Sequence, residues 1–166
     1  MGFKKTSETI AVSFGVSESA PNTFTQEQVA LQLDVLNNEI FVVVAADLNL
    51  QAPELVPGTT TECRGAITST SQTAIATLAN TNTIAEAQLS IVSAGGEAVS
   101  FQRAAEESYQ GDVDYIALIA TNDFFVGLTG VGNVGSMSLS GRVFGFRARA
   151  DSSTYAALVQ SEVLSA

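Results

Sequence analysis

Carboxylates are the side chains best supplied for chemistry, because the chain has 17 acidic residues and no histidine. The lack of histidine excludes a Ser-His-Asp triad, a Cys-His pair and a zinc site with histidine ligands. Two acids can still hydrolyse a bond together, one as the acid and the other as the base or nucleophile. The candidates for such work are Glu106 with Glu107, Asp112 with Asp114, and Asp47 in an apolar run. A hydrolase that uses only carboxylates is therefore one hypothesis for this sequence.

Asp112 and Asp114 are also the weak candidates for a metal site. The segment Asp-Val-Asp lacks the third spaced acid and the glycine of an EF-hand loop. Acids that meet between subunits can nevertheless bind Ca²⁺ through their oxygens. We therefore expect no cofactor, with a Ca²⁺ ion between subunits as the alternative.

The single cysteine, Cys63, has few routes to chemistry. One cysteine forms no disulfide within the chain, and a CxxC metal site is impossible. Arg64 beside it favours a thiolate, but without a histidine base we expect Cys63 to be a small inert residue. The glycine-rich residues 127–135 lack the following helix and the Lys-Ser/Thr of a phosphate-binding loop, so they are predicted to form a hairpin tip. These observations together predict that the chain is not an enzyme.

Three of the seven basic residues, Arg142, Arg147 and Arg149, lie within eight positions near the end of the chain. Alternation along a predicted strand over 137–150 places Arg142 on one face and the other two on the opposite face. So few cations on each face do not make a nucleic-acid surface in a chain of net charge −10. We expect Arg147 and Arg149 to pair with acids, either within the subunit or across a contact.

A helix is predicted over residues 152–165, because Asp151 and Ser152 form an N-cap and helical spacing follows. Tyr155, Leu158 and Val159 form its apolar face, which we expect to pack against the same sandwich or a neighbour. The predicted interface residues are therefore Arg142, Arg147, Arg149, Tyr155, Leu158 and Val159.

Strand patterns dominate the rest of the chain. Strands are predicted over residues 9–16, 24–35, 39–50, 84–92, 99–101, 115–121, 124–130 and 137–150. The Thr/Ser-rich residues 59–83 are predicted to form one or two long strands, with a flexible linker as the less favoured alternative. Residues 104–109 are predicted to form a brief helical turn. Strands at this spacing, without a βαβ period, predict an all-β fold. We expect an eight-stranded antiparallel jelly-roll sandwich with a short C-terminal helix. Residues 1–166 would form one domain, with residues 1–8 as an N-terminal arm.

Charged residues are only 14% of the chain, against roughly 25% in a typical soluble domain. So little charge favours a chain that buries surface against copies of itself. The alternative is a soluble monomer covered with Thr, Ser, Asn and Gln. We expect no membrane partner, because no apolar run approaches the roughly 20 residues of a membrane span.

Several stretches carry a resemblance to a known class of proteins. They are IFVVVAADLNLQAP at 40–53 with the Thr/Ser-rich segment after it, ATNDFFVGLTGVGN at 120–133, and RVFGFRARADSSTYAALV at 142–159. In these the chain resembles single-jelly-roll capsid (coat) proteins of small icosahedral viruses, in particular structural proteins inferred from environmental, often aquatic, viral sequences. The resemblance implies a sandwich that assembles with itself into the shell of a virion. The chain departs from such proteins in its acidity and in lacking an arginine-rich arm, which argues against genome contact more than against a shell role.

A second class of function also fits an all-β chain of this length. A secreted β-sandwich binding module, for carbohydrate or as a pilus or adhesin subunit, would need a signal peptide on a longer precursor. Carbohydrate binding would also need an aromatic platform, yet tryptophan is absent and there are only three tyrosines.

Overall fold

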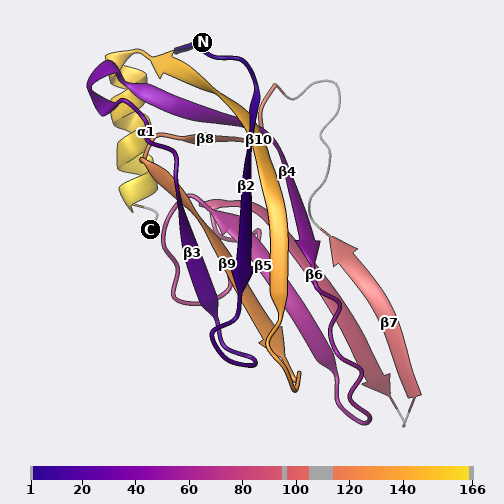
Figure 1. The fold of residues 1–166 in the computed structure, drawn as a ribbon. Coiled ribbons are helices and arrows are strands. Elements are labelled where there is room, and N and C mark those ends of the chain that lie inside the picture. The colour runs from indigo at the N-terminus through magenta and orange to yellow at the C-terminus, as the bar shows by residue number, and fades with distance from the viewer. Residues whose placement is uncertain (1, 95–96, 105–113, 165–166) are drawn as a thin grey trace.

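The computed structural model describes the backbone of residues 2–94, 97–104 and 114–164 and the side chains of residues 2–93 and 114–164 (Figure 1). Its elements, in chain order, are β1 (Phe3–Lys5), β2 (Ile10–Ser17), β3 (Thr25–Ala30), the 3₁₀ turn η1 (Val35–Asn37), β4 (Glu39–Leu50), β5 (Thr61–Thr68), β6 (Thr83–Ala94), β7 (Glu97–Ala104), β8 (Ala117–Ile119), β9 (Asp123–Val131), β10 (Ser138–Ala150) and α1 (Ser152–Leu164). In the part of the chain described, no helix is long and apolar enough to cross a membrane.

The strands form two antiparallel sheets that pack face to face. In the first sheet the order is β2-β10-β4-β8, with β1 pairing the end of β10 beside β2; in the second it is β3-β9-β5-β6-β7. Successive strands from β2 to β5 change sheets, and β8, β9 and β10 do the same. This order is that of a jelly roll to which β1 and β7 have been added. The expected all-β sandwich with a short C-terminal helix is confirmed.

The main core lies between the two sheets and a second apolar cluster lies outside the first sheet. The main core includes Val16, Phe41, Val43, Ile67, Phe124, Val126, Leu128 and Val143. In the second cluster Ile40 and Val42, on the opposite face of β4, pack with Ala148 and with side chains of α1. The start of β4 is therefore buried on both faces, which explains its unbroken apolar run.

A β-bulge changes which residues of β4 face the core. The partners Phe144↔Ala45 and Gly145↔Val43 leave Val44 as an extra residue in β4. Core residues are odd-numbered before the bulge (Phe41, Val43) and even-numbered after it (Ala46, Leu48, Leu50). The bulge therefore turns Asp47 outward, where it lies opposite Arg142 of β10.

Three predicted strands are shorter than expected, and the one expected over 115–121 is reduced to the three residues of β8. The strand expected over 24–35 ends at Ala30, because Gln32 has a φ of 54° and the chain then enters η1. The strand or strands expected over 59–83 end at Thr68, and residues 69–82 form a loop. The expected helical turn at 104–109 lies almost entirely outside the described residues, and Ala104 itself ends β7.

The loop of residues 69–82 lies over the outer face of the second sheet and is anchored to β3. Gln26 Nε2 donates to Ser71 Oγ at 2.9 Å, and Gln26 Oε1 accepts from Gln72 N at 2.9 Å. Within the loop, Asn82 Nδ2 donates to Thr70 Oγ1 at 2.9 Å. Side chains of this kind satisfy loop hydrogen bonds locally and compete with strand pairing, which explains why a Thr/Ser-rich stretch does not continue as a strand.

Candidate assembly surfaces

Arg147 joins the last strand to the connection between β3 and β4. Its Nη1 forms an ion pair with Glu39 Oε1 at 2.6 Å, and its Nη2 donates to the carbonyl oxygen of Leu31 at 2.6 Å. Nη1 also donates to the carbonyl oxygen of Gln32 at 3.2 Å. Arginine suits this position because its planar fork reaches a carboxylate and backbone carbonyls at once. Arg147 thus meets its acid inside the subunit.

The other two predicted interface arginines are exposed. Arg142 lies opposite Asp47 on the outer face of the first sheet. Arg149 Nη2 lies 3.5 Å from Asn37 Oδ1, and Lys4 of β1 is its direct partner across the strands. Neither Arg149 nor Lys4 forms an ion pair with any acid that the structure describes. Acids nevertheless lie close by, since Glu39 is opposite Arg149 across β4 and β10, and Asn37 also bonds to Asp34, the N-cap of η1.

The C-terminal helix packs on its own subunit. Tyr155, Leu158 and Val159 join the second cluster against β4 and β10, and each is half-buried. Asp151 caps the helix, because its Oδ1 accepts from Thr154 N at 2.7 Å. That backbone hydrogen bond, followed by hydrogen bonds from the hydroxyls of Thr154 and Ser153, lowers the pKa of Asp151.

Glu162 is the buried residue of α1 and fastens the helix to the first sheet. It is 6% exposed, and its Oε1 and Oε2 accept hydrogen bonds from Ala120 N at 2.8 Å and from Thr121 N at 3.1 Å. The carboxylate therefore satisfies backbone donors at the turn between β8 and β9, a role that no local sequence pattern around Glu162 indicates. A pocket of about 200 Å³ lies beside it, between α1, β8 and the end of the 69–82 loop.

At the other end of the sandwich, a second buried acid holds three segments together. Glu18 is 5% exposed, and its Oε2 accepts from Thr23 N at 2.9 Å and from Gly130 N at 2.8 Å. Its Oε1 accepts from Met137 N at 2.7 Å. A single carboxylate thus connects the end of β2 with both sides of the β9–β10 loop.

Two asparagines and Glu54 complete this network. Asn22 and Asn133 bond reciprocally, since Asn22 Nδ2 donates to Asn133 O at 2.8 Å and Asn133 N donates to Asn22 Oδ1 at 2.9 Å. Asn133 Oδ1 accepts from Glu54 N at 3.0 Å, and Glu54 Oε1 accepts from Gly135 N at 2.6 Å. The β2–β3, β4–β5 and β9–β10 loops are therefore cross-linked to one another, at the end of the molecule away from α1 (Figure 1).

These loops carry exposed apolar side chains, which we call the apolar tip: Leu55, Val131 and Val134. Leu55 is 66% exposed, Val134 is 73% exposed and Val131 is 44% exposed. Glu54 bonds to the residues on both sides of Val134, so Leu55 and Val134 are held close together. The sequence predicts a hairpin tip here. It does not predict the hydrogen bonds from this tip to two other loops, because those bonds join residues about 80 to 110 positions apart.

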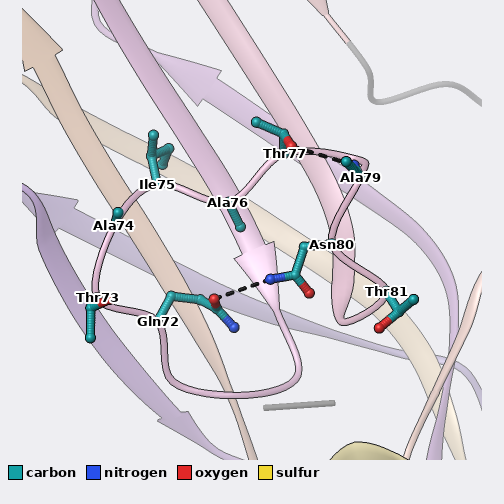
Figure 2. Close-up of a pocket in the computed structure, with 9 residues that line it drawn as sticks. All are labelled: Gln72, Thr73, Ala74, Ile75, Ala76, Thr77, Ala79, Asn80 and Thr81. Atoms are coloured by element: carbon teal, nitrogen blue, oxygen red, sulfur yellow. Dashed lines mark hydrogen bonds between the residues drawn. The ribbon is translucent and has the colours of Figure 1, made fainter.

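An open pocket of about 540 Å³ lies within the loop of residues 69–82. Its lining runs from Gln72 to Thr81, and Asn80 Nδ2 donates to Gln72 Oε1 at 3.2 Å across it (Figure 2). The walls are hydroxyl, amide and aliphatic groups with neither charge nor aromatic ring. They offer hydrogen bonds to an uncharged polar molecule but no group suited to acid–base work.

Of the acids singled out from the sequence, the structure describes two, Asp47 and Asp114. Asp47 and Asp114 are both exposed, while Asp112 and the pair at 106–107 lie outside the described residues. No group of three or more Cys, Asp or Glu residues that could hold a metal occurs within the described part of the chain. The proposed calcium site stays a prediction.

Cys63 lies in the main core and is fully buried. Burial raises the pKa of its thiol to about 12, and the negative charge of Glu18 adds to the shift. A thiol with this pKa is protonated at neutral pH, so the expected inert character agrees with its surroundings.

Comparisons with known proteins find weak structural similarity and no match in sequence. No protein-family model matches the chain, and no curated protein matches it. Two solved structures that are similar over most of their length are viral. A chain of Desmodium yellow mottle tymovirus is 8% identical, with 84% of this chain and 87% of that chain covered and a TM-score of 0.32. A chain of Turnip yellow mosaic virus is 11% identical, with 87% and 94% covered and a TM-score of 0.30.

Proposed function

We propose that this chain is a structural protein that assembles with copies of itself into a viral capsid shell. The observation that carries the proposal is the apolar tip. Leu55 and Val134 are largely exposed, yet buried polar contacts fix the loops that bear them. Such a surface binds a protein partner at little cost in ordering, because its loops are already in place.

The fold and the composition support the same proposal. Jelly rolls serve as shell-forming domains in viruses and also as lectins and cupins, so the fold alone does not decide between these functions. The complete lack of histidine argues against a cupin metal centre of the usual kind. The low content of charged residues suits a protein whose surface is largely covered by neighbouring copies.

The open pocket at residues 72–81 favours one alternative, a module that binds an uncharged, hydroxyl-rich ligand such as a carbohydrate. Such ligands gain much of their binding from stacking on aromatic rings, and this pocket has none among its lining residues. The shell function therefore remains the better supported of the two.

The proposed function is tested on the purified full-length chain by size-exclusion chromatography with light scattering and by negative-stain electron microscopy. We expect particles or large oligomers. A strict monomer at high concentration, across low and high salt and with or without Ca²⁺, would contradict the proposal. If the particles dissociate when a chelator is added, the result supports Ca²⁺ bound between subunits. If the particles stay intact with the chelator, the calcium hypothesis is wrong.

A further inference from the structure

Strand β2 lies at the outside of the first sheet, beside β10 (Figure 1). One of its edges pairs with β10 in an unbroken register, from Ile10↔Gly145 to Ser17↔Ser138. Among the strands that the structure describes, none pairs with the other edge. Alternate residues of β2 therefore direct backbone N–H and C=O groups away from the sheet, along eight residues that span roughly 26 Å.

An open edge of this kind is normally blocked against other chains by charges, a proline, a bulge or short length. The remaining outer strands of this protein follow that rule. β1 contains Lys4 and Lys5, β3 contains Glu27, β7 contains Glu97 and Arg103, and β8 has only three residues. β2 has the sequence IAVSFGVS, without charge or proline, and its pairing with β10 has no bulge. Of the outer strands described, β2 alone is open to a further strand.

The side chains of β2 also suit a neighbouring strand. Val12 and Phe14 point toward the main core but are only half-buried at its margin. Alternation places Ile10 on the same face, where it is 41% exposed. A further strand would continue this face and remove apolar surface from water. The opposite face carries only short, exposed side chains: Ala11, Ser13, Gly15 and Ser17.

The charges near β2 lie at its ends or on other strands. Glu8 is exposed two residues before the strand, whereas Glu18 after it is buried on three backbone amides. On the outer face, Arg142 of β10 lies opposite Ser13, and Asp47 of β4 lies opposite Arg142. In an antiparallel pair of β2 strands the two Glu8 side chains would lie at opposite ends of the contact. Two copies that each carry a net charge of −10 repel least where uncharged surfaces meet, and the free edge of β2 is such a surface.

We propose that β2 pairs edge to edge with β2 of a second copy, antiparallel about a twofold axis, so that the first sheets of both copies form one continuous sheet. The partner is a second copy because every copy presents the same uncharged edge, and a twofold pair covers both edges at once. Core-facing residues then lie opposite core-facing residues, since both sandwiches are on the same side of the joint sheet. The inference rests on the proposed function, of which this pair would be one contact.

Cross-linking tests the pairing, because the native Cys63 is fully buried. Ser13 lies near the middle of β2, so its two copies come within about 5–8 Å of each other in a pair centred there. Ser140 of β10 is the matched control, since it is exposed one strand further in, opposite Gly15. Its two copies would lie three strand spacings apart, roughly 14 Å. With a short bismaleimide, S13C should give about tenfold more covalent dimer than S140C. Equal yields would overturn the inference.

A lysine at the edge separates this inference from the proposed function. S13K and S140K change the net charge equally, and both should keep the native circular dichroism spectrum and unfolding midpoint because both sites are exposed. S13K should weaken self-association by at least about tenfold, since two lysines would face each other across the pair, whereas S140K should associate normally.

The outcomes distinguish the two proposals. If S13K forms native-sized particles as readily as the native chain, the edge pairing is wrong and the shell function stands. If the native chain forms only dimers, and S13C cross-links within them, the pairing stands and the shell function is wrong. A native chain that stays monomeric, with no preference for S13C in cross-linking, would contradict both.

Discussion

At the scale of single residues, the buried acids of this protein bind backbone amides. Glu18 accepts three backbone hydrogen bonds and Glu162 accepts two. A buried carboxylate costs free energy unless its oxygens are satisfied. Backbone donors satisfy them here, and neither acid forms an ion pair with another described residue. These two acids therefore fasten segments of the chain to one another.

Glu18→Gln should destabilise the fold, because an amide offers only one acceptor oxygen and turns an NH₂ group toward backbone donors. Leaving buried donors without an acceptor costs about 1–3 kcal/mol. The measurement is urea unfolding at pH 7, with the exposed Glu8→Gln as control, for which we expect a change within about 0.5 kcal/mol. Equal effects of the two substitutions would show that the Glu18 contacts contribute nothing specific.

Cys63 gives a prediction for alkaline pH. Below its ordinary pKa of 9 the thiol is protonated in both the folded and the unfolded chain. Between pH 9 and about 12 it ionises only when unfolded, because the folded pKa is about 12. The free energy of unfolding should therefore fall over this range, and should fall less in Cys63→Ala. Iodoacetamide should modify Cys63 in urea and leave it unmodified in the native protein; rapid native labelling would contradict the burial.

At the scale of elements, the attachment of α1 decides how much of the first sheet is covered. The helix follows β10 after one residue, Asp151, so it is directed onto the outer face of the strands it has just left. Its apolar contacts to Ile40 and Val42 bury the second face of β4. Glu162 adds a polar attachment near the end of the helix.

Glu162→Ala should loosen α1 and expose the backbone donors at Ala120 and Thr121. We expect a loss of about 1–3 kcal/mol in urea unfolding and faster amide hydrogen exchange at these two positions. Gln160→Ala is the matched control, since Gln160 is exposed on the same helix. Unchanged exchange at Ala120 and Thr121 in Glu162→Ala would mean that the carboxylate does not hold the helix.

At the scale of the whole molecule, net charge opposes the assembly that the apolar surfaces favour. Each copy carries a net charge of −10 at pH 7. Copies therefore repel one another over the Debye length, which is about 30 Å at 0.01 M salt and about 8 Å at 0.15 M. We therefore expect self-association to strengthen as NaCl rises over this range, followed by light scattering at fixed protein concentration. Association that weakens steadily with salt would show that ion pairs between subunits outweigh this repulsion.

Local patterns were enough to predict the class of the fold and the ends of its clearest elements. The alternation in 137–150, the apolar run of 39–50 and the cap at Asp151 are properties of neighbouring residues, and β10, β4 and α1 follow them. The lack of histidine likewise limited the available chemistry without any structure.

The candidate surfaces depended on contacts between distant residues, which only the tertiary structure decides. Composition does not show that Asn133 meets Asn22 and Glu54, or that Glu162 reaches the β8–β9 turn, because these pairs lie 42 to 111 positions apart. The bulge at Val44 likewise reverses the faces of β4 and places Asp47 outside, although its neighbours along the chain are apolar. The sequence by itself predicted most of the strands, because their alternation is a local property. The pairing of the strands determined which of their ends became rigid, apolar and available to a second copy.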